Sequence, residues 1–212
     1  NGGRRGTWAQ LSENGPGDAG PRLVEICDEV CCDLFLPVAL QSRKRLLVTA
    51  YTVDEEEHHP CVLVSDDDGE SWKTVFLNPT PKHTAVFPHR GTRWQNTGVE
   101  PSLAELADGS LMLLARTSLD CFYLYRSTDQ GDSWTSGEPS LFHGTLTTPF
   151  LLRLSDGRVL CFWNNTRPLA EPNHDFTWPP VSDSVENGLS EDVFTNRDVN
   201  HAAVTGDGVS WS

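Results

Sequence analysis

One eight-residue pattern occurs twice in this chain and nearly a third time. Residues 65–72 and 127–134 both read Ser-x-Asp-x-Gly-x-Ser-Trp, and residues 205–211 repeat it with Thr first and one residue fewer between Asp and Gly. In tight turns, hydroxyl and carboxylate side chains satisfy amide N–H groups and Gly turns the corner, while Trp places an apolar ring beneath. Copies that begin about 60 to 80 residues apart indicate a repeated structural unit.

The rest of the sequence predicts strands. Its apolar segments are short, rich in Val, Leu, Phe and Tyr, and bounded by Gly, Asp, Ser or Pro. No window keeps a helical period over three turns, so we expect an all-β chain. Asp-Gly pairs supply the positive-φ position that tight hairpins need. Three hairpins are predicted, joining residues 101–106 to 111–116, 149–154 to 159–163, and 34–40 to 46–52.

Composition limits the partners that such a chain takes. With 212 residues, 37% of them hydrophobic, it can build a sizeable core. Its 16 basic and 30 acidic residues give a net charge of −14 without a basic patch, so a nucleic-acid partner is not expected. No aliphatic run approaches the ~20 residues of a membrane span. The first residues, Asn-Gly-Gly-Arg-Arg-Gly, do not form a signal peptide, so we expect a processed product or a piece of a longer one.

The six cysteines divide into two groups of three. Cys61, Cys121 and Cys161 lie in or beside apolar strand-like runs and are interpreted as buried free thiols. The other three, Cys27, Cys31 and Cys32, have no second cysteine pair at zinc-site spacing, and the Asp-rich turns do not match a calcium-binding loop. We therefore expect no metal and no cofactor. A local disulfide from Cys27 to Cys31 or Cys32 remains open.

The octapeptides resemble the Asp-boxes, or BNR repeats, of the sialidase superfamily, in which each box joins the third and fourth strands of a propeller blade. The resemblance implies a six-bladed β-propeller, of which about three blades are present, beginning near Leu34, Glu100 and Thr148. Residues 34–212 are thus expected to form a partial propeller, with residues 1–33 a polar leader or partial blade. Radial closure hides blade edges, so we expect the remaining blades beyond Ser212.

The resemblance also implies site residues. Glu100 matches the carboxylate that activates a tyrosine nucleophile, and Arg116 and Arg197 match two of three arginines that grip the substrate carboxylate. A neutral tyrosine suits a substrate that already carries an anion beside the reacting carbon, and the arginine fork suits a carboxylate. Each of the three also has a structural interpretation: Glu100 as a solvated acid at the start of a strand, Arg116 as part of an ion pair at a strand end, and Arg197 as a loop residue. The nucleophile itself is not assigned, because the tyrosines present lie in early strands.

Two further positions bear on the chemistry. Asp54 or Glu56, in a run of four acids, falls where sialidases carry the acid/base residue, although a solvated acidic loop is the plain alternative. Phe35 falls where sialidases carry the first arginine of the clamp, so that arginine is missing. Losing one partner of a buried charge pair costs about 2–5 kcal/mol, enough to change the preferred sugar.

The function that follows from the resemblance is a sialidase-like glycoside hydrolase, exo-acting on a terminal acidic sugar such as sialic acid of a glycan substrate. The alternative is a non-catalytic Asp-box propeller that binds glycan or protein, for which the missing arginine is the best support. The Pro-rich insert with Phe176 and Trp178 is expected either to wall the site or to form a surface loop. The family resemblance slightly favours an extracellular or periplasmic location.

Overall fold

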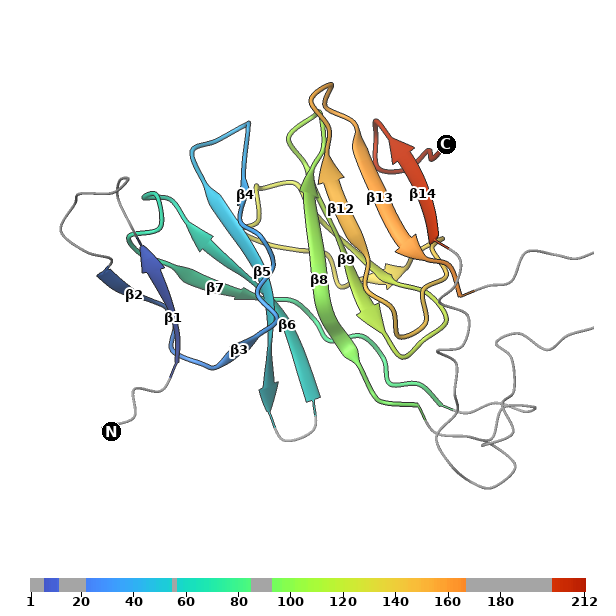
Figure 1. Cartoon of the computed structure of the whole chain (residues 1–212), viewed down its shortest axis with the longest axis horizontal. Helices are drawn as coiled ribbons and strands as arrows, with labels where there is room; N and C mark the ends of the chain where they lie inside the picture. The colour runs from blue at the N-terminus through green and yellow to red at the C-terminus, as the bar shows by residue number, and fades with distance from the viewer. Residues whose placement is uncertain (1–5, 12–21, 55–56, 85–92, 167–199) are drawn as a thin grey trace, which may run out of the picture.

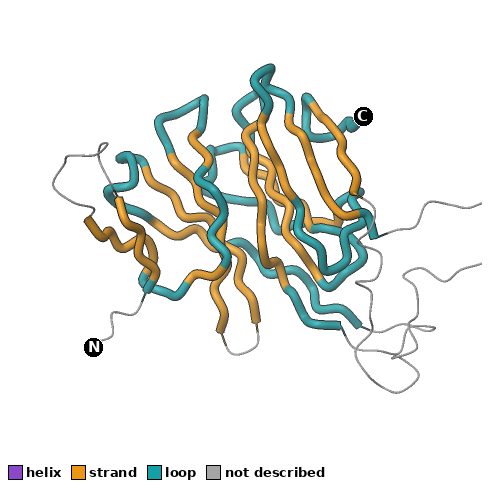
Figure 2. The backbone as a smooth tube through the Cα atoms, viewed as in Figure 1, coloured by secondary structure: helices purple, strands orange, loops and turns teal. Residues whose placement is uncertain are grey.

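The protein is all-β. The computed structural model describes residues 6–11, 22–54, 57–84, 93–166 and 200–212, which form strands, turns and loops (Figures 1 and 2). The strands are β1 (Thr7–Leu11), β2 (Arg22–Cys27), β3 (Cys31–Cys32), β4 (Val38–Ala39), β5 (Leu46–Asp54), β6 (Glu57–Ser65), β7 (Lys73–Phe76), β8 (Thr97–Glu105), β9 (Leu111–Thr117), β10 (Tyr123–Ser127), β11 (Glu138–Pro139), β12 (Phe150–Arg153), β13 (Val159–Asn164) and β14 (Asn200–Thr205). Among the described residues there is no helix able to cross a bilayer.

Three antiparallel sheets follow one another along the chain, as blades do in a propeller. Blade 1 has the order β3-β5-β6-β7, and β4 pairs with β5 beside β3. Blade 2 has the order β8-β9-β10-β11, and blade 3 the order β12-β13-β14. A separate hairpin, β1-β2, precedes blade 1. The blades stand side by side, and β8 of blade 2 lies between β5 and β6 of blade 1 on one side and β12 of blade 3 on the other (Figure 1). The fold is thus the partial β-propeller that the sequence predicted.

The two ends of the blades carry different features. At one end lie the three copies of the repeated pattern: box 1 (residues 65–72), box 2 (127–134) and the seven-residue box 3 (205–211). We call this the box end. At the other, the mouth end, β5 turns into β6 where Asp54 pairs with Glu57, and β8 begins where Thr97 pairs with Thr117. Box residues therefore do not share an end with Glu100 or Arg116.

Box 2 shows why the pattern needs its residue types. The Ser127 hydroxyl accepts the Gly131 amide at 2.8 Å and donates to Asp129 at 2.8 Å. Asp129 in turn accepts the amide of Ser133 at 2.9 Å and its hydroxyl at 2.5 Å. Gly131 has a φ of 93°, which favours glycine. The Ser133 hydroxyl chiefly lowers the pKa of Asp129, to about 2.

The other boxes repeat these contacts. In box 1 the Gly69 amide donates to the Ser65 hydroxyl at 2.8 Å and the Ser71 amide to Asp67 at 2.9 Å. In the shortened box 3 the Gly208 amide donates to Thr205 and the Ser210 amide to Asp207, at 2.8 and 2.7 Å. Removing one residue therefore leaves the turn intact, and the third copy predicted from the sequence is confirmed as the same structure.

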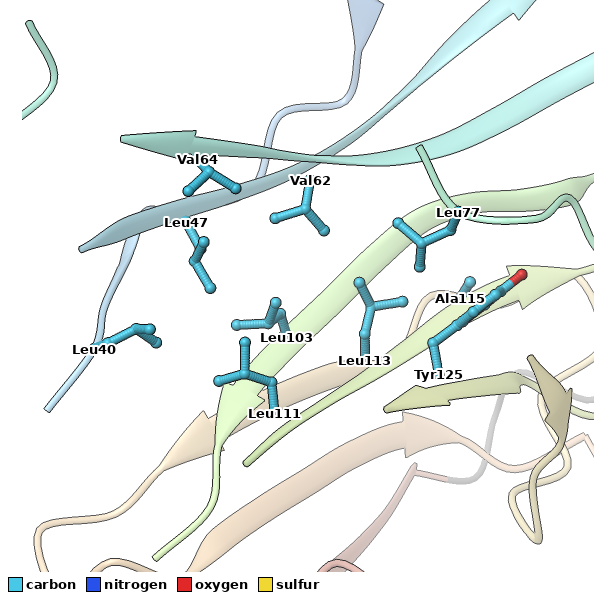
Figure 3. Packing of buried hydrophobic residues seen from close by; sticks show 10 residues of the cluster. All are labelled: Leu40, Leu47, Val62, Val64, Leu77, Leu103, Leu111, Leu113, Ala115 and Tyr125. Atoms are coloured by element: carbon cyan, nitrogen blue, oxygen red, sulfur yellow. The ribbon is translucent and has the colours of Figure 1, made fainter. Parts of the chain in front are cut away.

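The apolar core lies between the blades. One cluster fills the space between blades 1 and 2 (Figure 3), and its members are Leu40, Leu47, Val62, Val64, Leu77, Leu103, Leu111, Leu113, Ala115 and Tyr125. A second cluster joins blades 2 and 3. In it, the Phe142 ring contacts Trp163 and Trp211 edge to face, with ring centroids 4.7 and 4.8 Å apart. Trp211 belongs to box 3, so the last residue of the pattern anchors its turn to the core.

A buried arginine ties two boxes together at the box end. The Arg45 side chain is 1% exposed, and two of its nitrogens donate to Asp66 of box 1 at 2.8 Å each. Its third nitrogen lies 3.0 Å from Asp132 of box 2 and donates to the Gln130 carbonyl at 2.9 Å. Because Arg45 precedes β5, this one guanidinium joins blade 1 to blade 2.

Glu105 makes a second link between blades at the same end. Its buried carboxylate accepts the amides of Gln41 and Ser42 from blade 1, at 2.6 and 2.9 Å. From blade 3, Arg153 donates to the carbonyls of Glu105 and Leu106, both at 2.9 Å. Polar groups of all three blades therefore meet at Glu105, whose carboxylate also lies 3.7 Å from Arg153.

Two local predictions need correction. The strand predicted over residues 34–40 reduces to Val38–Ala39, because Asp33 adopts a φ of 45° and Pro37 has no amide to donate. Cys121, predicted to be buried, is partly exposed, whereas Cys61 and Cys161 are buried and all six cysteines are free thiols. The hairpins around the two Asp-Gly turns are confirmed in β8-β9 and β12-β13.

The Arg45 link predicts a stability effect. Replacing Arg45 by Met removes the buried cation between Asp66 and Asp132 and leaves them the exposed Arg43 and, for Asp132, Lys73. We expect the free energy of unfolding to fall by about 1–3 kcal/mol, less than is usual for a fully buried pair because both aspartates are half exposed. Urea denaturation followed by Trp fluorescence measures it. Arg43→Met, at an exposed neighbouring arginine, is the matched control and should cost less than about 0.5 kcal/mol. Equal losses would contradict the role of Arg45.

The boxes predict how stability depends on pH. Hydrogen bonds hold the pKa values of Asp67, Asp129 and Asp207 below the ordinary value. Such carboxyls contribute stability above the unfolded pKa of about 3.9, and this contribution is lost as pH falls through the folded pKa. We expect the urea midpoint to drop between about pH 4 and pH 2. Asp129→Asn should cost about 1 kcal/mol at pH 6, after allowance for solvent screening, and should make the acid decline shallower. An unchanged decline would contradict this assignment.

Candidate functional site

An irregular stretch of β8 places Glu100 at the mouth end. The pairing of β8 with β9 shifts register between Thr97 and Val99 and again between Val99 and Ser102. Glu100 lies in the second interval with a φ of 43°, a left-handed conformation that costs a non-glycine residue about 1 kcal/mol or more. Bulges of this kind redirect a side chain out of the regular alternation of a strand. The backbone is thus strained at Glu100, the residue for which the family resemblance predicts a catalytic role.

Glu100 is held by groups from two blades. The Arg116 Nη1 of β9 lies 2.7 and 2.8 Å from the two carboxylate oxygens of Glu100. The Thr148 hydroxyl, just before β12, donates to the same carboxylate. The two charged side chains keep 22% and 14% of their surface exposed, so the pair is reachable from solvent. One carboxylate is therefore oriented by a cation from blade 2 and a hydroxyl beside blade 3.

Blade 1 contributes an aromatic pair next to this carboxylate. Tyr51 of β5 and His58 of β6 stack edge to face, with ring centroids 5.4 Å apart. The Tyr51 hydroxyl donates to Asp33 at 2.8 Å. Burial, the Asp33 hydrogen bond and the nearby charge of Glu100 raise the pKa of Tyr51. Burial chiefly lowers the pKa of His58, and the charges of His59 and Arg116 act in the same direction.

Two polar atoms at this junction have no hydrogen-bond partner within the described part of the chain. They are Nε of Arg116 and Nδ1 of His58, and both are buried. Buried polar atoms in native proteins are nearly always paired with protein or water. A hydroxyl or water oxygen suits such a pair chemically, because it accepts from an arginine N–H and donates to a neutral imidazole nitrogen.

The start of β8 is packed tightly against the start of β6. The Thr97 hydroxyl accepts the His58 amide at 3.1 Å and donates to the His58 carbonyl at 2.9 Å. At Gly98, where φ is 109°, an added Cβ would lie 2.9 Å from Cγ of Pro60. Both contacts hold blade 1 against blade 2 next to Glu100.

Three other residues were predicted for the site, Asp54, Glu56 and Arg197, and the structure describes only Asp54. Asp54 ends β5 at the mouth end and is exposed. Glu56 and Arg197 lie outside the described residues, as do Phe176 and Trp178 of the insert. The structure thus brings Glu100 and Arg116 together and leaves Asp54 on the same end of the fold. It does not test the catalytic roles expected for these residues.

Phe35 lies at the centre, on the inner side of blade 1. Its amide donates to the Thr49 carbonyl at 3.1 Å, which places it between β3 and β4. It lines a hollow of about 270 Å³ shared by the inner strands of the three blades, together with residues such as Leu36, Leu103 and Phe150. Apolar side chains therefore dominate the place where the resemblance would put an arginine.

Sequence reasoning missed four residues that surround Glu100: Asp33, Tyr51, His58 and Thr148. Pairing of Asp54 with Glu57 fixes the β5-β6 register, and two-residue alternation then puts Tyr51 and His58 on one face. That signal was present in the sequence once the turn was located. For Asp33 and Thr148 no local signal exists, because their contacts come from segments distant along the chain.

The ion pair predicts energetic coupling between Glu100 and Arg116. We expect Glu100→Gln and Arg116→Met each to lower the free energy of unfolding, and the double variant to lose about 1–2 kcal/mol less than the sum. The reason is that the second change removes a charge already left without its partner. Urea denaturation of the wild type, the two single variants and the double variant measures this coupling energy. Additivity within about 0.5 kcal/mol would mean that the pair is not formed in solution.

Comparison with known proteins agrees with the fold. Residues 36–212 match the BNR repeat-like domain family. No curated protein sequence matches the chain. Among solved structures, the intramolecular trans-sialidase of Ruminococcus gnavus is 18% identical with a TM-score of 0.54, and the match covers 96% of this chain and 38% of that one.

Two further structures are similar. The NanB sialidase of Streptococcus pneumoniae is 24% identical with a TM-score of 0.50, covering 74% of this chain and 24% of the other. The α-L-arabinanase of Penicillium chrysogenum is 19% identical with a TM-score of 0.44, covering 85% and 48%. The chain thus spans about a quarter to a half of the length of these proteins. Since the family match takes in blades 1 to 3, the chain belongs to the BNR repeat-like domain family.

Proposed function

We propose that this protein is part of a sialidase-like glycoside hydrolase that acts on a terminal acidic sugar, with Glu100 as the carboxylate that activates the nucleophile. The observation that carries the proposal is the Glu100 site itself: a strained glutamate at the mouth end, oriented by Arg116 at 2.7 Å and by the Thr148 hydroxyl. Strained residues cluster at functional sites. Family membership and fold are consistent with a glycosidase, because the matched sialidases share the propeller.

The chemistry follows from this orientation. A carboxylate whose oxygens are held by an arginine and a hydroxyl keeps one geometry, as a proton relay to a nucleophilic hydroxyl requires. Tyr51 is not that nucleophile in this proposal, since its hydroxyl donates to Asp33 rather than to Glu100. Asp54, exposed at the same end, is the candidate acid that protonates the leaving sugar. Glu56 remains the alternative for this role.

The substrate is proposed to be an acidic sugar bound by fewer arginines than in sialidases. Arg116 is already engaged by Glu100, and Phe35 places an apolar ring at the centre. Each missing charged contact weakens carboxylate binding by about 2–5 kcal/mol, or roughly 30-fold or more. Sialic acid, uronic acids and 2-keto-3-deoxy sugars share the carboxylate, and they are the panel to be tested.

Further blades are proposed to complete the site. Large apolar side chains are exposed on the inner side of the blades: Leu36, just before β4, is 81% exposed, and Phe150 and Leu152 of β12 are 42% and 46% exposed. Propellers cover such surfaces by radial closure, and the match covers only 38% and 24% of the length of the two sialidases. The closing blades would also supply the nucleophile.

The test is an activity assay of the gene product that carries this chain together with its closing blades. We expect hydrolysis of at least one fluorogenic glycoside of the acidic-sugar panel. Glu100→Gln should lower kcat by about 10²–10⁴, because proton relay contributes rate enhancements of that order. Glu138→Gln on the outer strand β11 is the matched control and should leave kcat unchanged. Equal activity of wild type and Glu100→Gln would overturn the assignment.

A second candidate function is a non-catalytic propeller that binds glycan, and Phe35 with its apolar hollow is the observation that favours it. This alternative predicts binding of a sugar from the panel without turnover. Isothermal titration with the free sugars distinguishes the two. Saturable binding by a folded protein that hydrolyses no member of the panel would select the binding module over the enzyme.

A further inference from the structure

Three cysteines from separate segments come together in the apolar cluster that joins the β1-β2 hairpin to blade 1. They are Cys27 at the end of β2, Cys31 in β3 and Cys61 in β6. All three are buried, with 5%, 9% and 0% of their surface exposed, in one apolar cluster that also contains Ala50 and Leu63. Cys27 and Cys31 are close together in the sequence, whereas Cys61 is brought next to them only by the fold.

The three thiols share one buried cluster, and Thr7 adjoins two of them. Thr7 pairs with Cys27 in the β1-β2 hairpin, and its hydroxyl accepts the Cys31 amide at 2.6 Å. The hydrogen bond from Cys61 lowers the pKa of Cys31, although burial and the charge of Glu29 oppose this. The same contact raises the pKa of Cys61, and burial raises that of Cys27. Cys31 is thus the sulfur most readily present as a thiolate, the nucleophilic form.

Strand order decides which neighbour can bond to Cys31. Cys31 pairs with Thr52 on one side of β5, and Cys61 pairs with Ala50 on the other. Two strand spacings separate them by about 9–10 Å, beyond the Cα separation of about 7 Å that a disulfide spans. Cys27 belongs to the β1-β2 hairpin and has no strand between it and Cys31.

We propose that Cys31 and Cys27 form an oxidisable dithiol, in which a hydroperoxide converts the free thiols to a disulfide and Cys61 acts only as hydrogen-bond donor to Cys31. No group of three or more His, Cys, Asp or Glu side chains in the described ranges has the arrangement of a metal site. The small size of hydrogen peroxide suits a sulfur that lies on a two-residue edge strand with 9% of its surface exposed.

The chemistry balances in two steps. The Cys31 thiolate attacks one oxygen of hydrogen peroxide, the O–O bond breaks, and hydroxide leaves and is protonated to water, so that Cys31 becomes a sulfenic acid. The Cys27 sulfur then attacks the Cys31 sulfur, its proton and the hydroxyl leave as a second water, and the disulfide forms. Two thiols are oxidised, and one peroxide is reduced to two waters.

The disulfide would fix the β1-β2 hairpin to blade 1. The Thr7 hydroxyl of β1 already accepts the Cys31 amide at 2.6 Å, and the Thr74 hydroxyl of β7 donates to the Cys27 sulfur at 3.4 Å. Oxidation would replace the sulfur contact in this corner by a covalent bond. Because the inference rests on these residues alone, it does not depend on the proposed glycosidase activity.

Peptide mapping tests the proposal on the protein as it exists. The reduced protein is treated with hydrogen peroxide, free thiols are alkylated, and tryptic fragments are identified by mass spectrometry. We expect the fragment of residues 23–43 to lose two hydrogens, and cleavage after Glu29 to leave its halves joined through Cys27 and Cys31. A disulfide to Cys61, or all six cysteines still alkylated, would overturn the proposal.

Variants give an independent measurement. In Cys27→Ser the sulfenic acid of Cys31 has no partner, so a dimedone adduct should accumulate at Cys31 at least about tenfold above that in wild type. Cys32→Ser is the matched control, because Cys32 points to the other face of the strand, and it should leave the disulfide intact. Loss of the disulfide in Cys32→Ser, or no adduct in a folded Cys27→Ser, would contradict the roles assigned.

Discussion

The fold depends on an aspartate that accepts hydrogen bonds from main-chain amides and from serine or threonine hydroxyls within one turn. Asp67, Asp129 and Asp207 each do so, and each turn then carries a tryptophan into or against the core. Each turn is formed by residues close together in the sequence. The position of box 1 relative to box 2 is not local, because Arg45 binds both at once. Local turn chemistry and one buried guanidinium together set how blade 1 meets blade 2.

This division explains what the sequence could predict. The Asp-Gly hairpins and boxes are specified by residues within a few positions of one another, so spacing and residue type were enough to place them. Residues 34–40 failed as a strand because Asp33 and Pro37 break the extended chain on both sides of Phe35. Convergence of Glu100 with Arg116 was expected only from resemblance. Contacts such as Thr148 with Glu100 join blades, and no local pattern encodes them.

A charged environment at the mouth end lies next to an apolar one. Charged and aromatic side chains gather around Glu100, while the adjoining hollow of about 270 Å³ is largely apolar. Burying an anion in such a hollow without a cation is costly. For the acidic sugar proposed above, this arrangement favours a carboxylate on the polar side and a less polar ring face toward Phe35.

Gly98 has a consequence for the width of the mouth. Its missing side chain lets β8 approach Pro60 so closely that a single methyl group would act as a wedge between the first two blades. The Thr97 hydroxyl joins the same two strands through the His58 main chain, so the aperture between β6 and β8 is set by close packing at Gly98 together with one polar side chain. Widening the aperture therefore needs no new loop: one added carbon would spread the blades while every reactive side chain stays the same.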